Sequence, residues 1–299
     1  MRPLVLLACV LAVFTPPVAA QAQTVPIDQH QVLGATSVAA GQPTNRDAAQ
    51  TIRVPAADAE MALFVSGAGS QVIVLVAGGL GGNHRAWTTV QPKLTKFGRV
   101  VSYDRLGSGA STRSKRPRVA SNFVEELRQG LKNAGLQPPY LLVGHSYGGL
   151  MVRLFASRYP KEVSGLVLVD PVSENFYRRA QVEAPQEFLK EYEKIQAEAD
   201  ASESEALRRD WLGYETSLQQ LRAAPAMRGG KIVILSAAET DLPERLRWVW
   251  LDEHARWAKN AGATHTYVKS GHSIHQEQPD AVVHAVELVL GTFGERVRR

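Results

Sequence analysis

The stretch "VGHSYGGLMVRLFASRYP", residues 143–160, places a serine between glycines at the point where an apolar run becomes a helical pattern. The apolar residues before it are typical of a buried strand, and the pattern after it is typical of an amphipathic helix that stops at Pro160. Serine is also a common first residue of ordinary helices, so Ser146 decides little by itself. Gly144 and Gly148 favour another interpretation, because a sharp strand-to-helix turn leaves no room for side chains there. We therefore take Ser146 as a candidate nucleophile whose partners must lie far away along the chain.

The rest of the chain repeats this alternation of strand and helix patterns. Near-continuous Val, Leu and Ile runs separated by helical segments predict a mostly parallel, doubly wound α/β sheet. The alternation breaks at about 172–229, a charged, Ala-rich segment of helical propensity, and then resumes. We expect one domain over 51–299, with this segment as a helical cap above the carboxyl ends of the strands, where such sheets bind ligands. Pro92 either interrupts the helix expected at 84–98 or marks a new start. The expected strands are 61–67, 71–79, 99–104, 139–144, 163–170, 231–237 and 264–270, and the expected helices are 84–98, 121–135, 146–160, about 243–260 and 280–297.

The first residues carry the pattern of a secretory signal. One Arg is followed by an apolar run from Leu4 to Phe14 and then by small residues, which predicts a signal peptide at 1–22. The run is shorter than the roughly 20 residues that span a bilayer. Residues 23–50 show no sustained periodicity of apolar residues, and we expect them to form an extended or disordered lead-in to the domain. The sequence thus predicts a soluble periplasmic or secreted protein.

Cysteine content, net charge and histidine spacing argue against several kinds of site and partner. Cys9 is the only cysteine and lies in the predicted signal peptide, so the mature chain would have neither a disulfide nor a thiol nucleophile. The formal charge of +5 is small for 299 residues and the basic residues are scattered, which argues against a nucleic-acid partner. The histidines show no metal-ligand spacing, and we expect no metal. The oligomeric state stays open.

Four local patterns, from about residue 60 to the C-terminus, resemble those of the α/β-hydrolase family. The third is the turn around Ser146, and the last places His272 after a strand and a glycine, before the final helix. The resemblance implies the α/β-hydrolase fold and a serine esterase-like or lipase-like activity, with Ser146 as nucleophile and His272 as general base. An aspartate in place of Ser146 would have suggested epoxide or haloalkane hydrolysis instead. The four patterns are "VLVAGGLGGNHRAW", "VVSYDRLGSGAS", "LLVGHSYGG" and "VKSGHSIHQEQPDAV".

The resemblance leaves the acid partner of His272 open. The family commonly places it after the strand that follows the cap, where Asp241 lies, with Glu239 as a weaker substitute. Some members place it one strand beyond the nucleophile, where Asp170 ends the run "GLVLVD". We favour Asp170 and keep Asp241 as the alternative, although either could be an ordinary turn or loop carboxylate.

The same resemblance implies an oxyanion hole made of two main-chain N–H groups, those of Tyr147 and Leu80. Leu80 lies in the glycine-rich loop 78–82, where family members often carry a His-Gly pair and this chain has Gly78-Gly79. The difference removes a side chain that usually braces the loop but leaves the donors in place. The loop matches neither G-x-G-x-x-G nor a P-loop, so we expect no nucleotide or other cofactor.

Further histidines could compete with His272. His275 is expected to be a loop residue or a residue that supports the site, and His145 is expected to point away from the nucleophile's side of the turn. We interpret the remaining histidines as structural or surface residues: His84, His254, His265 and His284.

Three functions stay open at this point. The leading hypothesis is a secreted serine hydrolase that cleaves carboxylic esters. The second is an amide or peptide hydrolase of the aminopeptidase type, in which a cap carboxylate would hold the substrate amine, and the third is a binding protein that kept the fold without the chemistry. The candidate amine-binding residues are Glu183, Glu187, Glu191 and Glu193, and the candidate pocket aromatics are Phe176, Tyr177, Phe188, Trp211 and Tyr214.

Overall fold

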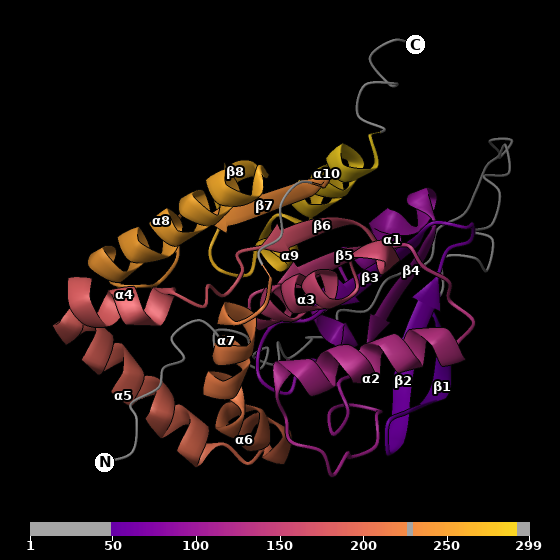
Figure 1. The fold of residues 1–299 in the computed structure, drawn as a ribbon, viewed down its shortest axis with the longest axis horizontal. Coiled ribbons are helices and arrows are strands. Elements are labelled where there is room, and N and C mark those ends of the chain that lie inside the picture. The colour runs from indigo at the N-terminus through magenta and orange to yellow at the C-terminus, as the bar shows by residue number, and fades with distance from the viewer. Residues whose placement is uncertain (1–48, 226–229, 292–299) are drawn as a thin grey trace, which may run out of the picture.

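The apolar runs of the sequence form a single sheet in a computed structural model of the chain, which describes residues 49–225 and 230–291 (Figure 1). Its strand order is β1-β2-β4-β3-β5-β6-β7-β8. Strand β2 pairs antiparallel with β1 and β4, and every other pair of neighbours is parallel. The strands are β1 Gln50–Ala56, β2 Ala59–Ser66, β3 Val72–Val76, β4 Arg99–Tyr103, β5 Tyr140–His145, β6 Val163–Val169, β7 Ile232–Ala237 and β8 Thr264–Val268.

Helices cover both faces of the sheet, which explains why its central strands are apolar on both sides. One buried cluster joins the sheet to α2, α3 and α8, and a second joins it to α10 and the short helices after β3. This confirms the predicted doubly wound α/β fold. The helices outside the cap are η1 His84–Trp87, α1 Gln91–Leu94, η2 Thr95–Phe97, α2 Ala120–Asn133, α3 Tyr147–Arg158, η3 Pro160–Glu162, α8 Glu244–Ala261, α9 Ile274–Glu277 and α10 Pro279–Leu290.

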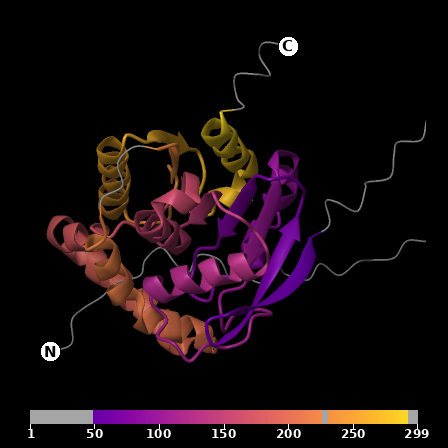
Figure 2. The same cartoon turned by 45° about the vertical axis from the view of Figure 1, so that its right-hand side comes forward.

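The charged segment after β6 forms four helices that lie together on one side of the molecule, with α10 on the opposite side (Figures 1 and 2). The first packs against α8, and the last packs against α2 and α3. The segment is therefore anchored to the core at both ends, and we call it the cap. Its helices are α4 Phe176–Glu183, α5 Pro185–Ala201, α6 Glu205–Leu212 and α7 Tyr214–Arg222.

Two local expectations were wrong. Strand β1 was not predicted, and Gln50, assigned to the lead-in, is its first residue. The single helix expected at 84–98 is instead two 3-10 turns and the one-turn helix α1, because Pro92 lies at the start of α1 and cannot donate a helical hydrogen bond.

The predicted signal peptide and nearly all of the lead-in lie outside the described residues. Within the described ranges, no helix is long and apolar enough to cross a membrane.

Candidate active site

Ser146 occupies a strained turn between β5 and α3. Its φ of 50° and ψ of −118° are rarely adopted by a residue with a side chain, and such a conformation costs about 1–3 kcal/mol. A Cβ added to Gly144 would lie 2.6 Å from the carbonyl oxygen of Gly148, and one added to Gly148 would lie 2.3 Å from that of Val76. The turn therefore needs glycine at both positions, as the sequence pattern indicated.

Asp170 follows β6 and lies beside this turn. The N–H of Ser146 donates to the carbonyl of Val169 at 3.0 Å, so the two strand ends are joined one residue before Asp170. Asp170 is fully buried, and its φ of 42° places a second non-glycine residue in the left-handed region. Its Oδ1 accepts hydrogen bonds from the N–H of Ala237 at 3.0 Å and from the indole of Trp250 at 3.1 Å. These donors fix the carboxylate and leave Oδ2 facing another partner.

That partner is His272, in the loop between β8 and α9. Its Nδ1 lies 2.6 Å from Oδ2 of Asp170. Because the carboxylate is an acceptor, Nδ1 carries the proton and Nε2 carries the lone pair. Nε2 is buried and has no hydrogen-bond partner among the described residues. The ring therefore has the tautomer that a general base requires.

His145 connects His272 back to the turn. Its Nε2 donates to the main-chain carbonyl of His272 at 3.0 Å, and the two rings lie 4.7 Å apart. A Cβ added to Gly78 would lie 2.5 Å from Nδ1 of His145 and 2.9 Å from Cβ of Ser146. His145 thus fills the space beside Gly78, which explains why this loop has no histidine of its own. It is a supporting residue that contacts the main chain of His272.

The alternative acids lie elsewhere. Asp241 and Glu239 are exposed in the loop after β7, and no contact between either side chain and His272 is found in the described part of the chain. Trp250 on α8 and the main chain of Ala237 were not singled out from the sequence as partners of Asp170. The strand-end position of Asp170 was the signal that pointed to the carboxylate itself.

Electrostatics keep Asp170 charged. Burial opposes ionisation of its carboxyl, but the hydrogen bond and charge of His272, together with the Ala237 N–H, hold its pKa below the ordinary value. Burial, with the nearby rings of His275 and His272, holds the pKa of His145 well below its usual range. Burial likewise lowers the pKa of His275 to about 3. His145 and His275 are therefore neutral at physiological pH.

The glycine-rich loop after β3 passes beside the turn at Gly78, two residues before Leu80. Leu80 is buried, and its N–H makes no hydrogen bond to another described residue. Tyr147 is the first residue of α3, where helix N–H groups lack an intrahelical acceptor. Arg105 braces the loop by donating to the carbonyls of Ala77, at 2.9 Å, and Gly79. This arginine supplies the bracing that the Gly78-Gly79 pair cannot, and it is not among the site residues predicted from the sequence.

The other histidines have structural contacts. Nδ1 of His84 lies 2.7 Å from Oδ1 of Asp104. Nε2 of His254 donates to the carbonyl of Pro171 at 2.7 Å, and its Nδ1 lies 2.7 Å from the hydroxyl of Ser236. That hydroxyl lies 2.8 Å from Nε2 of His265. His275 lies in the short helix α9 rather than in a loop, and its fully buried ring lies 4.2 Å from that of His145. His284 lies on α10, 3.8 Å from Glu287.

The cap aromatics form a packed cluster that reaches the neighbour of Ser146. The hydroxyl of Tyr147 donates to Ser217 at 2.8 Å, and its ring lies 5.1 Å from that of Tyr214. The cluster continues through Phe176, Tyr177 and Trp211, and Phe188 is also buried in the cap.

The four cap glutamates do not contact Asp170 or His272 in the described structure. Glu183 pairs with Arg179, Glu187 with Arg245 and Glu191 with Lys194, and Glu193 is exposed.

A family model matches most of the chain. The sequence profile of the alpha/beta hydrolase fold matches residues 72–279, which covers β3 to the start of α10 and includes Ser146, Asp170 and His272. The chain belongs to the α/β-hydrolase family. This confirms the resemblance and the fold class inferred from the sequence, and it makes the chain a member of a hydrolase family.

Individual relatives share little sequence with this chain. The uncharacterized protein YqjL of Bacillus subtilis is 27% identical over 217 residues, which cover 71% of this chain and 81% of YqjL. A thermophilic esterase from Thermogutta terrifontis superposes with a TM-score of 0.56 at 18% identity, covering 81% of this α/β-hydrolase and 98% of the esterase. The haloalkane dehalogenase DatA from Agrobacterium tumefaciens also superposes with a TM-score of 0.56, at 17% identity. The superposition covers 82% of this chain and 98% of DatA. At such identities the two structures show the shared fold alone, since one fold supports several reactions.

Proposed function

We propose that this α/β-hydrolase cleaves carboxylic esters through an acyl-enzyme on Ser146. The observation that carries the proposal is the 2.6 Å contact between Asp170 and His272, because it leaves the lone pair of His272 on Nε2. A serine at the strained turn favours acyl transfer over the aspartate-dependent reactions of epoxide and haloalkane hydrolysis.

In the proposed reaction, Nε2 of His272 takes the proton from the Ser146 hydroxyl as the oxygen attacks the ester carbonyl. Asp170 stays ionised and stabilises the imidazolium that forms. The N–H groups of Leu80 and Tyr147 stabilise the negative oxygen of the tetrahedral intermediate. His272 then gives its proton to the leaving alcohol, and the acyl group stays on Ser146.

The second half of the reaction repeats these roles with water. His272 takes a proton from water as it attacks the acyl-enzyme, and the acid is released as Ser146 regains its proton. No cofactor takes part in these steps. We further propose that the protein is exported after removal of residues 1–22, in line with the signal-like sequence of that segment.

The test is hydrolysis of p-nitrophenyl acetate, butyrate and decanoate by the chain from residue 23 onward, beside Ser146→Ala. We expect turnover by the parent and a loss of at least about 10³-fold in kcat for Ser146→Ala, because the nucleophile is removed. The rank order of the three esters then gives the acyl-chain length that the pocket accepts.

The same assay separates the competing functions. If the folded parent does not hydrolyse the esters but cleaves aminoacyl p-nitroanilides, it is an amide hydrolase. If it turns over neither substrate class and does not react with a fluorophosphonate, the hydrolase proposal is wrong and a binding role is favoured. The cap glutamates already argue against amine binding near the triad, since their contacts are with cationic side chains of the cap and α8 or with solvent.

A further inference from the structure

Helix α6 of the cap lies directly on the loop that carries Leu80. A Cβ added to Gly81 would lie 3.4 Å from Cβ of Ala206 and 3.6 Å from the main-chain nitrogen of Leu207. Gly81 also has a φ of 70°, which a residue with a side chain rarely adopts. A Cβ would therefore just contact α6, and it is the positive φ that favours glycine at this position.

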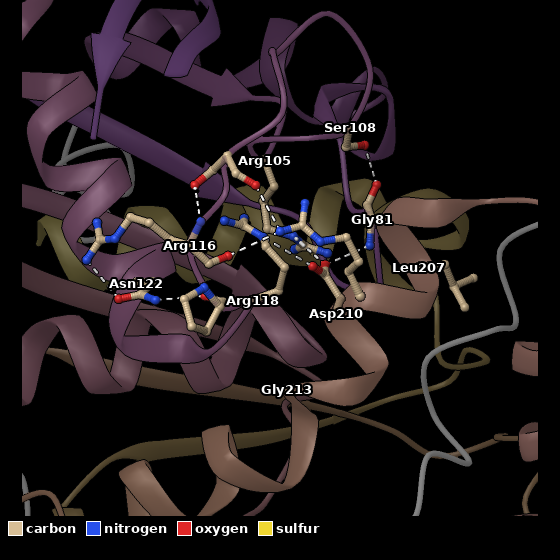
Figure 3. A network of polar contacts seen from close by, with 12 residues as sticks. Gly81, Arg105, Ser108, Arg116, Arg118, Asn122, Leu207, Asp210 and Gly213 are labelled. Carbon is tan, nitrogen blue, oxygen red and sulfur yellow. Dashed lines mark hydrogen bonds and ion pairs between the residues drawn. The ribbon is translucent and has the colours of Figure 1, made fainter. Parts of the chain in front are cut away.

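One buried carboxylate spans this contact. Oδ2 of Asp210, on α6, accepts a hydrogen bond from the N–H of Gly81 at 2.9 Å, across 129 residues of sequence (Figure 3). Gly81 follows Leu80, so this bond constrains the peptide next to the proposed oxyanion donor. The carbonyl of Gly81 is held as well, by the hydroxyl of Ser108 at 2.5 Å. Both polar groups of Gly81 are thus fixed.

Asp210 also faces the arginine that braces the same loop. Its Oδ2 lies 3.4 Å from Nε of Arg105, and its Oδ1 lies 3.6 Å from Nε of Arg118 (Figure 3). Nη1 of Arg118 in turn donates to both carboxylate oxygens of Glu126, at 2.8 and 3.0 Å. All four side chains are at most 4% exposed, so two guanidinium groups are balanced by two carboxylates away from water. Removal of one carboxylate would leave an uncompensated buried charge beside the loop.

We propose that Asp210 is a positioning residue that couples the cap to the oxyanion hole. It holds the N–H of Leu80 in its orientation by fixing Gly81 directly and Arg105 electrostatically. The assignment rests on the proposed function, because Leu80 is a donor only if Ser146 forms a tetrahedral intermediate. Asp210 does not itself contact the reacting atoms in this account.

The test compares Asp210→Asn and Asp210→Ala with Glu205→Gln. Glu205 is a matched control, since it lies on the same helix and pairs with the exposed side chain of Arg113, between β4 and α2. It is itself half exposed and makes no contact with the loop among the described residues. We expect kcat for p-nitrophenyl butyrate to fall at least about tenfold in both Asp210 variants, less than the 10²–10³ lost when an oxyanion donor is removed outright. KM should stay within about twofold, because the donor acts mainly in the transition state. Glu205→Gln should match the parent.

Hydrogen exchange of the peptide that contains residues 78–82 gives a second readout that needs no activity. Exchange at this loop should speed up in Asp210→Ala and stay at the parent rate in Glu205→Gln. The positioning role is overturned if the folded Asp210 variants keep parental kcat, or if kcat falls with unchanged loop exchange. An inactive parent whose loop exchange still depends on Asp210 would instead refute the proposed hydrolase function and leave only the structural coupling.

Discussion

Ser146 and Asp170 are both held in left-handed backbone conformations without being glycine. Each costs about 1–3 kcal/mol, and such strain persists only where the surrounding structure enforces it. The N–H of Ser146 is tied to Val169, and the N–H of Asp170 donates to Leu235 at 2.7 Å. Neighbouring strands thus hold both residues in these conformations, and that of Asp170 brings its carboxylate to within 2.6 Å of Nδ1 of His272.

The identity of the acid can be tested at the level of single atoms. Asp170→Asn keeps the shape of the side chain but presents an amide to Nδ1 of His272, which favours the wrong tautomer. We expect kcat to fall by about 10⁴-fold, while Asp241→Asn, which changes an exposed carboxylate, stays within about twofold of the parent. Steady-state kinetics of the two variants shows which carboxylate is the partner of His272. A larger loss of kcat in Asp241→Asn than in Asp170→Asn would contradict the assignment of Asp170.

At the scale of elements, the central strands and the turn at Ser146 were predictable because local sequence determines them. Continuous apolar runs indicate buried parallel strands, and the glycines around Ser146 indicate a turn without room for side chains. Strand β1 was missed because it is an edge strand whose first four residues are exposed or only partly buried, so its apolar signal is weak. The break of the segment at 84–98 into three pieces could be suspected only from Pro92.

The contacts between elements could not be predicted in the same way. Asp210 meets Gly81 across 129 residues, and no local pattern marks either residue as a partner of the other. The choice between Asp170 and Asp241 likewise needed the packing of α8, which brings the indole of Trp250 to Asp170. Sequence motifs named Ser146 and His272, whereas the residues that position them came from tertiary structure.

At the scale of the whole molecule, buried neutral histidines tie stability to pH. His275 has both ring nitrogens buried without a hydrogen-bond partner among the described residues, and its pKa is about 3. In the unfolded chain the same group titrates at about 6.5. The unfolded state therefore binds more protons between these values, and stability, fully present above about pH 6.5, is lost as pH falls toward 3. The lowered pKa values of His145 and His254 act in the same direction.

This linkage can be measured with His275→Leu, which removes the titrating group and keeps a buried apolar side chain. Between pH 7 and pH 5, His275 should account for a loss of about 2 kcal/mol in the free energy of unfolding. We expect urea unfolding curves of the variant to show a weaker pH dependence by that amount. His284→Gln, at a half-exposed position on α10, is the control and should behave as the parent. An equal loss in all three proteins would contradict the linkage.

The central claim is that Ser146 is a nucleophile activated by His272, and the most direct measurement is the site of covalent labelling. The parent would be incubated with a fluorophosphonate and its mass and modified peptide determined, beside Ser146→Ala. The account predicts a single adduct on the peptide that contains Ser146 and no adduct in Ser146→Ala. A folded parent that stays unmodified, or carries the adduct on another residue, would contradict it.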